Sequence, residues 1–243
     1  MFSPSRIKTL QRILSAAERA IFERALEVGG RAVLKAADIL RADVRRRAED
    51  TMTMLGKLLH EEANAIADKD RGPHARPLTA AERKAIVEAY GSDPDPSRVR
   101  IVPGPGESIV AFAAFVKGNP AITIGNTIYL RWGQKKINYP DFTRSDEGLD
   151  MLVHEYSHVI QYHRLGFSRF GARYAAELTR ARGDADSLYD YKHRKTTFNT
   201  ETLEGQAEMV GNYAKVKSGS GALSRAEAAG LRKRLKGSGV YGL

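Results

Sequence analysis

The chain of 243 residues contains no cysteine, and this absence removes two kinds of site. Disulfide bonds and thiolate ligands to a metal both need cysteine sulfur, so neither can occur. The sequence also lacks the apolar run of about 18 residues that a membrane-spanning helix requires. Its first residues lack the apolar core of a secretory signal peptide. We therefore expect a chain that is cytoplasmic, or exported by a route that needs no such signal.

Acidic residues are fewer than basic ones. The chain has 29 aspartate and glutamate residues and 39 lysine and arginine residues, which gives a formal net charge of +10. Residues 79–208 carry 17 of each sign, so the surplus lies in the two flanking regions. Basic clusters at 45–47 and 232–236 could attract an acidic partner, nucleic acid or anionic lipid. No nucleic-acid-binding motif accompanies them, so the sequence favours a plain basic surface over a nucleic-acid partner.

The segment Met151–Ile160 contains a His-Glu-x-x-His motif, formed by His154, Glu155 and His158. Histidines four residues apart lie on one face of a helix about one turn apart, so both imidazoles can reach one ion. A metalloprotease places the carboxylate that activates zinc-bound water directly after the first histidine. The motif predicts a zinc site with Glu155 as general base, although chance spacing on a polar helix face would look the same.

The ion needs a third protein ligand, and the sequence limits its source. Metzincins place a glycine and a third histidine at fixed offsets past the motif, where this chain has Gln161 and Arg164. His163 lies about 140° around the helix from that ligand's direction, and we interpret it as a partly exposed residue near the helix end. The remaining candidate is a carboxylate from a separate element.

The best candidate for that carboxylate lies in residues 197–210, where Glu204 and Glu208 are four residues apart and share a predicted helix face. We predict Glu204 as the third metal ligand. Glu208 is predicted to accept the N–H of a ligand histidine, which would fix the tautomer of that ring. Glu201 and Glu208 are the rival ligands, and an ordinary solvated acidic helix is the alternative interpretation.

Peptide hydrolysis also needs a hydrogen-bond donor for the oxyanion of the tetrahedral intermediate. Tyr191 and His193, between the two predicted ligand helices, are the first candidates. Tyr189 and Tyr213 are further ones, and packing or surface roles would explain most of these aromatic residues equally well.

The segment Ala121–Leu130 has a Thr-x-Gly-x-x-Ile-Tyr core, and the motif helix continues with Val159 and Gln161. Together these blocks resemble the bacterial minigluzincin-type zinc metallopeptidase domains, over roughly residues 98–165. The chain departs from that pattern just before the first histidine, where Leu152 and Val153 replace a small residue. The resemblance implies a zincin-like fold and a zinc-dependent peptidase whose substrates are largely unassigned. Because some of these domains occur in toxins and effectors, it also suggests delivery by a contractile injection or similar secretion system.

The sequence predicts an α+β fold with a small antiparallel sheet before the motif helix. Strands are expected at Val99–Val102 and Ile109–Val116, and a hairpin is expected across Gly125-Asn126. Residues 123–129 could flank a cleft where an extended peptide adds as a strand, or they could be scaffold only.

The motif helix is predicted to begin at Ser145, with acidic residues in its first turn, and to stop at Gly166. Gln161, nearly one turn after His158, could hydrogen-bond across the site. An apolar stripe on this helix is expected to bury it against the sheet and to hold the imidazoles rigid.

The predicted organisation is a helical N-terminal region at residues 1–92, a zincin-like domain at 93–217 and a basic C-terminal helix or tail at 218–243. Apolar residues at spacings of three and four between Val33 and Ile66 predict a long amphipathic helix. It could pack on the same chain, act as a lid or dock to a partner. The glycine, serine and lysine content of the tail predicts a mobile end.

These patterns together predict a gluzincin-type zinc metallopeptidase that acts on a protein or peptide substrate, with Zn²⁺ held by His154, His158 and Glu204. The alternative is a non-catalytic binding module, in which the zincin scaffold carries basic helices that dock to a protein, nucleic-acid or membrane partner. The presence of Glu155 argues against this alternative, since a site that has lost its catalytic activity does not need that carboxylate.

Overall fold

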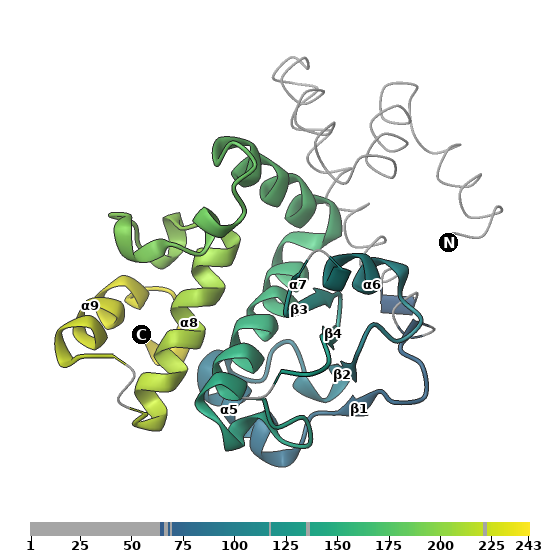
Figure 1. Ribbon diagram of the computed structural model, residues 1–243. Coiled ribbons are helices and arrows are strands. Elements are labelled where there is room, and N and C mark those ends of the chain that lie inside the picture. Colours follow the sequence, from purple (N-terminus) through teal and green to yellow (C-terminus); the bar gives the residue numbers. More distant parts are fainter. Residues whose placement is uncertain (1–63, 66–67, 69, 117, 135–136, 221–222) are drawn as a thin grey trace.

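The structure is a computed structural model that describes residues 64–243 apart from 66–67, 69, 117, 135–136 and 221–222. This part of the chain is α+β, with a four-stranded sheet beside the paired helices α7 and α8 (Figure 1). The long amphipathic helix predicted between Val33 and Ile66 falls almost wholly outside the described residues.

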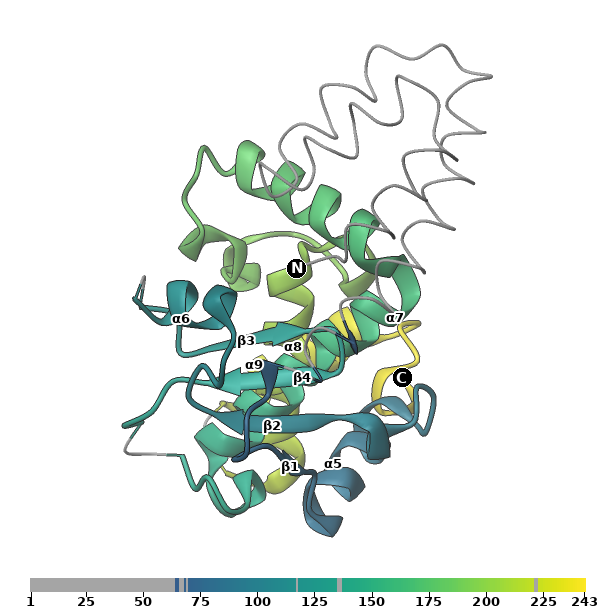
Figure 2. The same ribbon diagram turned by 90° about the vertical axis from the view of Figure 1, so that its right-hand side faces the viewer.

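The sheet has the strand order β1-β2-β4-β3. Its strands are β1 Arg76–Pro77, β2 Arg100–Pro103, β3 Ala121–Ile124 and β4 Thr127–Leu130. Figure 2 shows them side by side, with α7 and α8 behind the sheet in that view. The predicted hairpin is confirmed, because β3 and β4 pair across a two-residue turn in which Gly125 has a φ of 57°.

The prediction of a purely antiparallel sheet is wrong, because β2 runs parallel to β4. A parallel pair needs a crossover connection, and helix α6 Ile109–Val116 lies within it. The strand predicted at Ile109–Val116 is therefore wrong as well. Alanines within the segment favour a helix, and Ser108 Oγ accepts the N–H of Ala111 at 3.3 Å in its first turn.

The motif lies on helix α7 Asp146–Arg180, which begins as predicted. Ser145 is its N-cap, and the hydroxyl accepts the N–H of Gly148 at 3.1 Å. Gly166 has a φ of 73° and a ψ of 162°, which interrupts the helix. The first helical segment therefore ends at the predicted residue. The chain then continues as a helical segment up to Arg180, which the sequence did not predict. The apolar stripe is buried as expected, through Leu152, Val153, Tyr156, Val159 and Ile160.

The other helices are α5 Ala80–Tyr90, α8 Leu203–Ser218 and α9 Arg225–Leu235. Short 3-10 turns connect the elements at Pro96–Arg98, Phe142–Arg144, Asp186–Leu188, Tyr191–His193, Phe198–Thr200 and Val240–Gly242. None of the helices in the described part combines the length and apolar character needed to cross a bilayer.

One core joins elements from most of the described chain. Ile86 of α5, Val153 of α7, Val210 of α8 and Leu235 of α9 are all buried in it. The mobile tail predicted from composition is wrong where the structure describes it, because Leu235 and Val240 are at most 1% exposed. The division of the chain at residues 92 and 217 stays a prediction.

Candidate metal centre

Three side chains from two helices meet at one point. His154 and His158 of α7 and Glu204 of α8 offer ligand atoms that all lie within 4.8 Å of one another. The Nε2 atoms approach the same oxygen, Oε2 of Glu204, at 3.4 Å from His154 and 3.2 Å from His158. Ligands about 2.0–2.1 Å from one zinc ion at tetrahedral angles are about 3.3 Å apart. The spacing of the three atoms therefore fits one ion.

The lack of a hydrogen-bond partner for one oxygen of Glu204 also fits a bound cation. Its Oε2 atom is buried and has no hydrogen-bond partner among the described residues. A buried carboxylate oxygen without a partner is destabilising, and a metal ion at this point would supply the missing partner. Two imidazole nitrogens and one carboxylate oxygen are a donor set that suits zinc and leaves a fourth position open.

The second ring nitrogen of each histidine faces an acceptor. His158 Nδ1 lies 2.8 Å from Gln161 Oε1, and His154 Nδ1 lies 3.5 Å from Glu208 Oε2. Both acceptors favour a proton on Nδ1, which leaves the Nε2 lone pair free to face Glu204. Gln161 and Glu208 thus lie where the sequence placed them, and the role of Glu208 in fixing His154 stays a prediction.

Charges around the three side chains shift the pKa values of both histidines and of Glu204. Burial lowers the pKa of His154 and of His158, but nearby carboxylates together outweigh burial and raise both pKa values above the ordinary value. Glu204 and Glu155 act on both histidines, and Glu208 also acts on His154. Burial raises the pKa of Glu204, yet His158 and His154 outweigh it and hold that pKa well below the usual range. The point shared by the three side chains therefore favours positive charge.

A hydrogen-bond chain joins α7 to the start of α8. Gln161 Nε2 donates to the carbonyl of Leu203 at 2.9 Å and to Gln206 Oε1 at 3.2 Å. Gln206 Nε2 in turn donates to the carbonyl of Phe198 at 2.8 Å. Because Gln161 also contacts His158, this chain fixes the position of that imidazole relative to Glu204.

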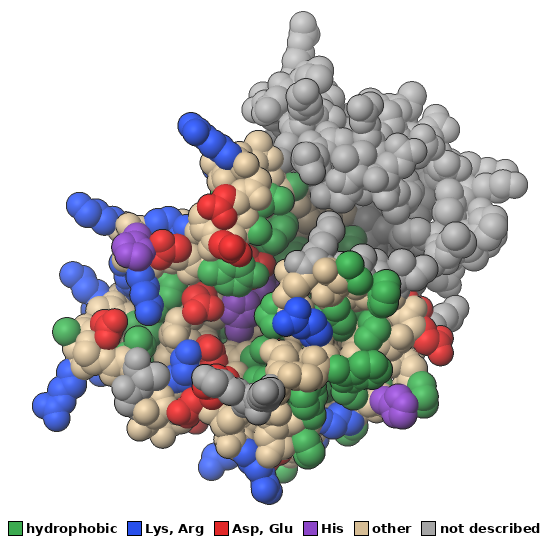
Figure 3. All heavy atoms as spheres, viewed as in Figure 1, with side chains coloured by type: hydrophobic (Ala, Val, Ile, Leu, Met, Phe, Trp, Pro, Cys, Tyr) green, Lys and Arg blue, Asp and Glu red, His purple; other side chains and the backbone are tan. Residues whose placement is uncertain are grey.

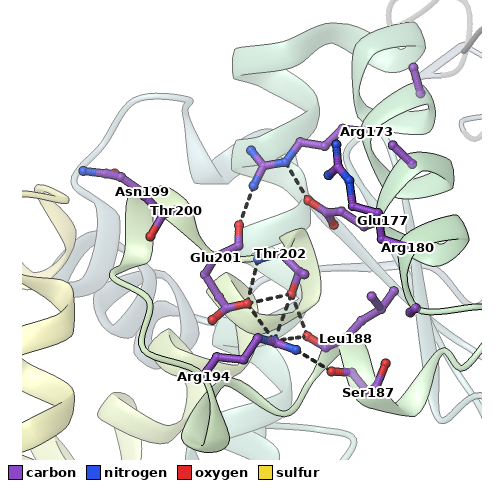
Figure 4. A pocket seen from close by; sticks show the side chains of 13 residues that line it. Arg173, Glu177, Arg180, Ser187, Leu188, Arg194, Asn199, Thr200, Glu201 and Thr202 are labelled. Atoms are coloured by element: carbon purple, nitrogen blue, oxygen red, sulfur yellow. Dashed lines mark hydrogen bonds and ion pairs between the residues drawn. The ribbon is translucent and has the colours of Figure 1, made fainter.

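A second polar network holds the first turn of α8 (Figure 4). Glu177 accepts the N–H of Leu203 at 2.9 Å and Nε–H of Arg173 at 2.8 Å. Arg194 lies 2.6 Å from Glu201, the residue proposed as a rival ligand. That carboxylate also accepts the N–H of Thr202 at 2.8 Å, so Glu201 supports the helix and does not reach the histidines. The cavity of about 640 Å³ beside this network is lined by none of the three candidate ligands.

Glu155 lies against the sheet. It is 7% exposed, and Thr123 Oγ1 of β3 donates to its Oε2 at 2.7 Å. A cavity of about 450 Å³ opens beside Glu155 and His154. Figure 3 shows a histidine side chain at the centre of this face of the molecule, in a hollow. The remaining lining residues are Asn119, Pro120, Ala121, Gln134, Ile137, Glu147, Asp150, Met151, Tyr189 and Glu208.

The structure does not bring the two favoured oxyanion donors to this cavity. Tyr191 is 4% exposed in the core, with the guanidinium carbon of Arg234 5.8 Å from its ring centroid. His193 points to solvent, and its Nδ1 lies 2.7 Å from an oxygen of Asp190. Both residues belong to one 3-10 turn, which directs the tyrosine inward and the histidine outward. Neither lines the cavity, so the placement predicted for them is wrong.

Among the candidate oxyanion donors, Tyr189 is the one that lines the cavity. Its ring stacks on His154 with centroids 5.8 Å apart. Burial raises the pKa of the Tyr189 phenol and the charge of Glu204 raises it further, so the hydroxyl keeps its proton. Tyr213, the other candidate, instead packs against Tyr241 in the core.

Sequence reasoning missed Glu147 and Asp150, which line the cavity on the same side of α7 as His154. Their spacing carried the signal, because positions 147, 150, 154 and 158 are three and four residues apart and share one helix face.

Residues 77–166 match the family model described as the eCIS core domain. The matched region includes His154, Glu155 and His158 and ends before Glu204. The chain is also similar to the effector domain of Pseudomonas aeruginosa VgrG2b, with 21% identity and a TM-score of 0.49 over 76% of this chain and 97% of that one. A likeness of this size carries no conclusion about fold or function. No curated protein matches the chain.

Proposed function

We propose that the protein is a gluzincin-type zinc peptidase, in which His154, His158 and Glu204 hold the ion and Glu155 is the general base. The observation that carries the proposal is the convergence of both Nε2 atoms on Glu204 Oε2, at 3.4 Å and 3.2 Å. This oxygen has no hydrogen-bond partner in the part of the chain that the structure describes. The order of residues in the motif adds support, because Glu155 follows the first histidine directly.

Zinc bound there would supply a Lewis acid that lowers the pKa of a water molecule. The chain's own residues would move the protons. Thr123 binds Glu155 Oε2 at 2.7 Å, which leaves Oε1 to take a proton from the attacking water and deliver it to the leaving amine. The protonated phenol of Tyr189, on the cavity wall, would donate to the peptide carbonyl oxygen as it gains charge.

The position of β3 supports an extended peptide as substrate. β3 is an edge strand, and its first residue, Ala121, lines the cavity. Hydrogen bonding alternates along an antiparallel pair, and Ile124 and Thr127 flank the two-residue turn as a bonded pair. The backbone N–H and C=O groups of Ala121 and Thr123 therefore point away from β4, where an added strand can pair with them.

Zinc dependence is the direct test of the proposal. We expect the purified protein to carry about one zinc ion per chain and to hydrolyse an unfolded protein, since a zincin with three protein ligands keeps the fourth position for chemistry. A chelator should stop hydrolysis, and zinc should restore it. Zinc at 100 times its Kd should also stabilise the folded chain by about 2.7 kcal/mol. Elemental analysis, a protease assay and thermal melts measure these effects.

The same assay separates the peptidase from the binding-module alternative. A binding module would take up zinc without hydrolysing any substrate. A protein that carries no zinc and ignores added zinc in the melt would contradict the proposed metal site.

The contact between Thr123 and Glu155 gives a second test. Thr123→Val removes the donor but keeps the shape, so Glu155 loses its orientation and kcat/KM should fall about tenfold. Zinc content should not change, because Thr123 contacts none of the proposed ligands. Thr123→Ser is the matched control, since it keeps a hydroxyl and should keep most of the activity. Full activity in the valine variant would remove Thr123 from this role.

We further infer that the peptidase is an effector exported by an injection system. The similarity of residues 77–166 to the eCIS core domain supports this inference. Its activity would then be directed at a protein of the cell that receives it, and a secretion apparatus would be one of its partners.

A further inference from the structure

The loop between α7 and α8 carries Tyr189 to the candidate centre, where its ring stacks on His154 with centroids 5.8 Å apart. Two hydrogen bonds of the Tyr189 backbone stay within this loop. Its N–H donates to the carbonyl of Asp186 at 3.2 Å, and its carbonyl accepts the N–H of Tyr191 at 2.8 Å. The position of the phenol therefore also depends on the contacts that anchor the loop.

Arg194 anchors the two residues that precede Tyr189. Its Nη1 donates to the carbonyl of Ser187 at 2.6 Å, and its Nη2 donates to the carbonyl of Leu188 at 2.9 Å. Thr202 Oγ1 donates to the same Leu188 carbonyl at 2.6 Å. This carbonyl belongs to the planar peptide group that also contains the nitrogen of Tyr189. Holding its oxygen therefore fixes the direction in which the chain enters Tyr189.

The guanidinium is itself held by a buried carboxylate. Arg194 Nη2 lies 2.6 Å from Glu201 Oε1, and the side chain of Glu201 is 1% exposed. Burial raises the pKa of Glu201, but hydrogen bonds from Thr196, Arg194 and the backbone of Thr202 outweigh burial and hold that pKa below its ordinary value. The carboxylate is therefore charged at neutral pH, and the ion pair with Arg194 is present there.

This ion pair joins the loop to the helix that carries the third proposed ligand. Glu201 directly precedes Thr202, the N-cap of α8, and lies three residues before Glu204. Figure 4 shows the same guanidinium bonded to Glu201 and to the loop. Arg194 does not line the cavity beside Glu155, so an effect of Arg194 on the reaction would have to act through the residues that it holds.

We propose that Arg194 is a positioning residue of the peptidase, which holds the phenol of Tyr189 in place beside His154. The proposal rests on the proposed peptidase function, in which Tyr189 donates to the peptide carbonyl oxygen. Arginine suits this role because its planar fork can donate to two carbonyls and pair with a carboxylate in one geometry, whereas a lysine ammonium is a point charge.

A double-mutant cycle with the full-length, zinc-loaded protein tests this role. Arg194→Gln should lower kcat about tenfold with KM unchanged, because a displaced donor stabilises the oxyanion less in the transition state. Tyr189→Phe alone should lower kcat about 10²-fold. In the Tyr189→Phe background, Arg194→Gln should cost nothing further. A residue that merely supports the fold would lower kcat by the same factor in both backgrounds.

Two controls accompany the cycle. Zinc content should not change in Arg194→Gln, because Glu177 and Gln161 still bind Leu203 in the first turn of α8. Arg180→Gln is the matched control variant and should keep the wild-type kcat. Arg180 lines the same cavity of about 640 Å³ as Arg194, is exposed, and has no bond to the other residues drawn in Figure 4.

The position of the ring can be measured without any reaction. With 4-fluorophenylalanine in place of Tyr189 in the full-length, zinc-loaded protein, one fluorine reports on the ring beside His154. Its NMR signal should shift and broaden in Arg194→Gln, because the ring then samples more positions, and should stay unchanged in Arg180→Gln. If Arg194→Gln does not fold, Arg194→Lys takes its place. It keeps a charge for Glu201 but loses the fork, so the signal should shift and kcat should fall about threefold.

The outcomes separate this proposal from the one on which it rests. An unchanged kcat and fluorine signal in the Arg194 variants of an active peptidase, or an equal loss of kcat in both backgrounds, would overturn the role of Arg194 and leave the peptidase in place. A fluorine signal that moves only in the Arg194 variants, in a protein that cleaves nothing, would support the placement of Tyr189 by Arg194 and contradict the peptidase.

Discussion

Glu155→Gln is expected to lower peptide hydrolysis by about 10²–10⁴-fold while zinc content stays unchanged. The amide keeps the size of the carboxylate and can still accept the hydrogen bond that Thr123 now gives at 2.7 Å. It cannot take a proton from water and return it to a leaving amine, so only the chemical step is lost. Values of kcat/KM on a peptide substrate and elemental analysis of the same sample measure the two effects.

Glu107→Gln is the control for this experiment, because Glu107 is exposed and does not line the cavity. The control should hydrolyse the peptide at the wild-type rate. Turnover near the wild-type rate in Glu155→Gln would remove Glu155 from its proposed role. If the protein is an effector, production inside a susceptible cell should be toxic with Glu155 present and harmless with glutamine in its place.

Glu204→Ala is expected to weaken zinc binding by more than about 100-fold. Loss of a residue that merely orients a ligand costs about 10–100-fold in metal affinity, and loss of a ligand should cost more. The substitution removes the oxygen that lies 3.4 Å from His154 Nε2 and 3.2 Å from His158 Nε2. Two imidazoles alone would remain. Competition with a chelator of known affinity measures the change.

Glu208→Gln is the graded control for the metal site. Glu208 contacts His154 only through Nδ1, at 3.5 Å, so its loss should weaken zinc binding about tenfold. Both variants should keep the fold, which circular dichroism checks. Wild-type zinc affinity in Glu204→Ala would move the third ligand to another residue.

Much of the candidate site could be predicted because its geometry depends on spacing along helices. The motif places His154 and His158 one turn apart, and the contact between α7 and α8 brings Glu204 to the same point. The cap at Ser145 and the turn at Gly125 are also local patterns, since each depends on a few neighbouring residues.

Features that depend on distant contacts were predicted less well. The apolar segment Ile109–Val116 satisfies the pattern of a buried strand and that of a buried helix, and periodicity alone does not separate them. The parallel pairing of β2 with β4 depends on that crossover. Tyr191 and His193 differ in burial because of the orientation of one short turn, and composition gives no signal for this.

The three proposed ligands come only from α7 and α8, whereas the residue that orients Glu155 comes from β3. In the proposed enzyme, metal affinity and the orientation of the general base would therefore depend on different layers of the fold. A substitution in the edge strand could then slow the reaction while the ligand set on the two helices stays intact.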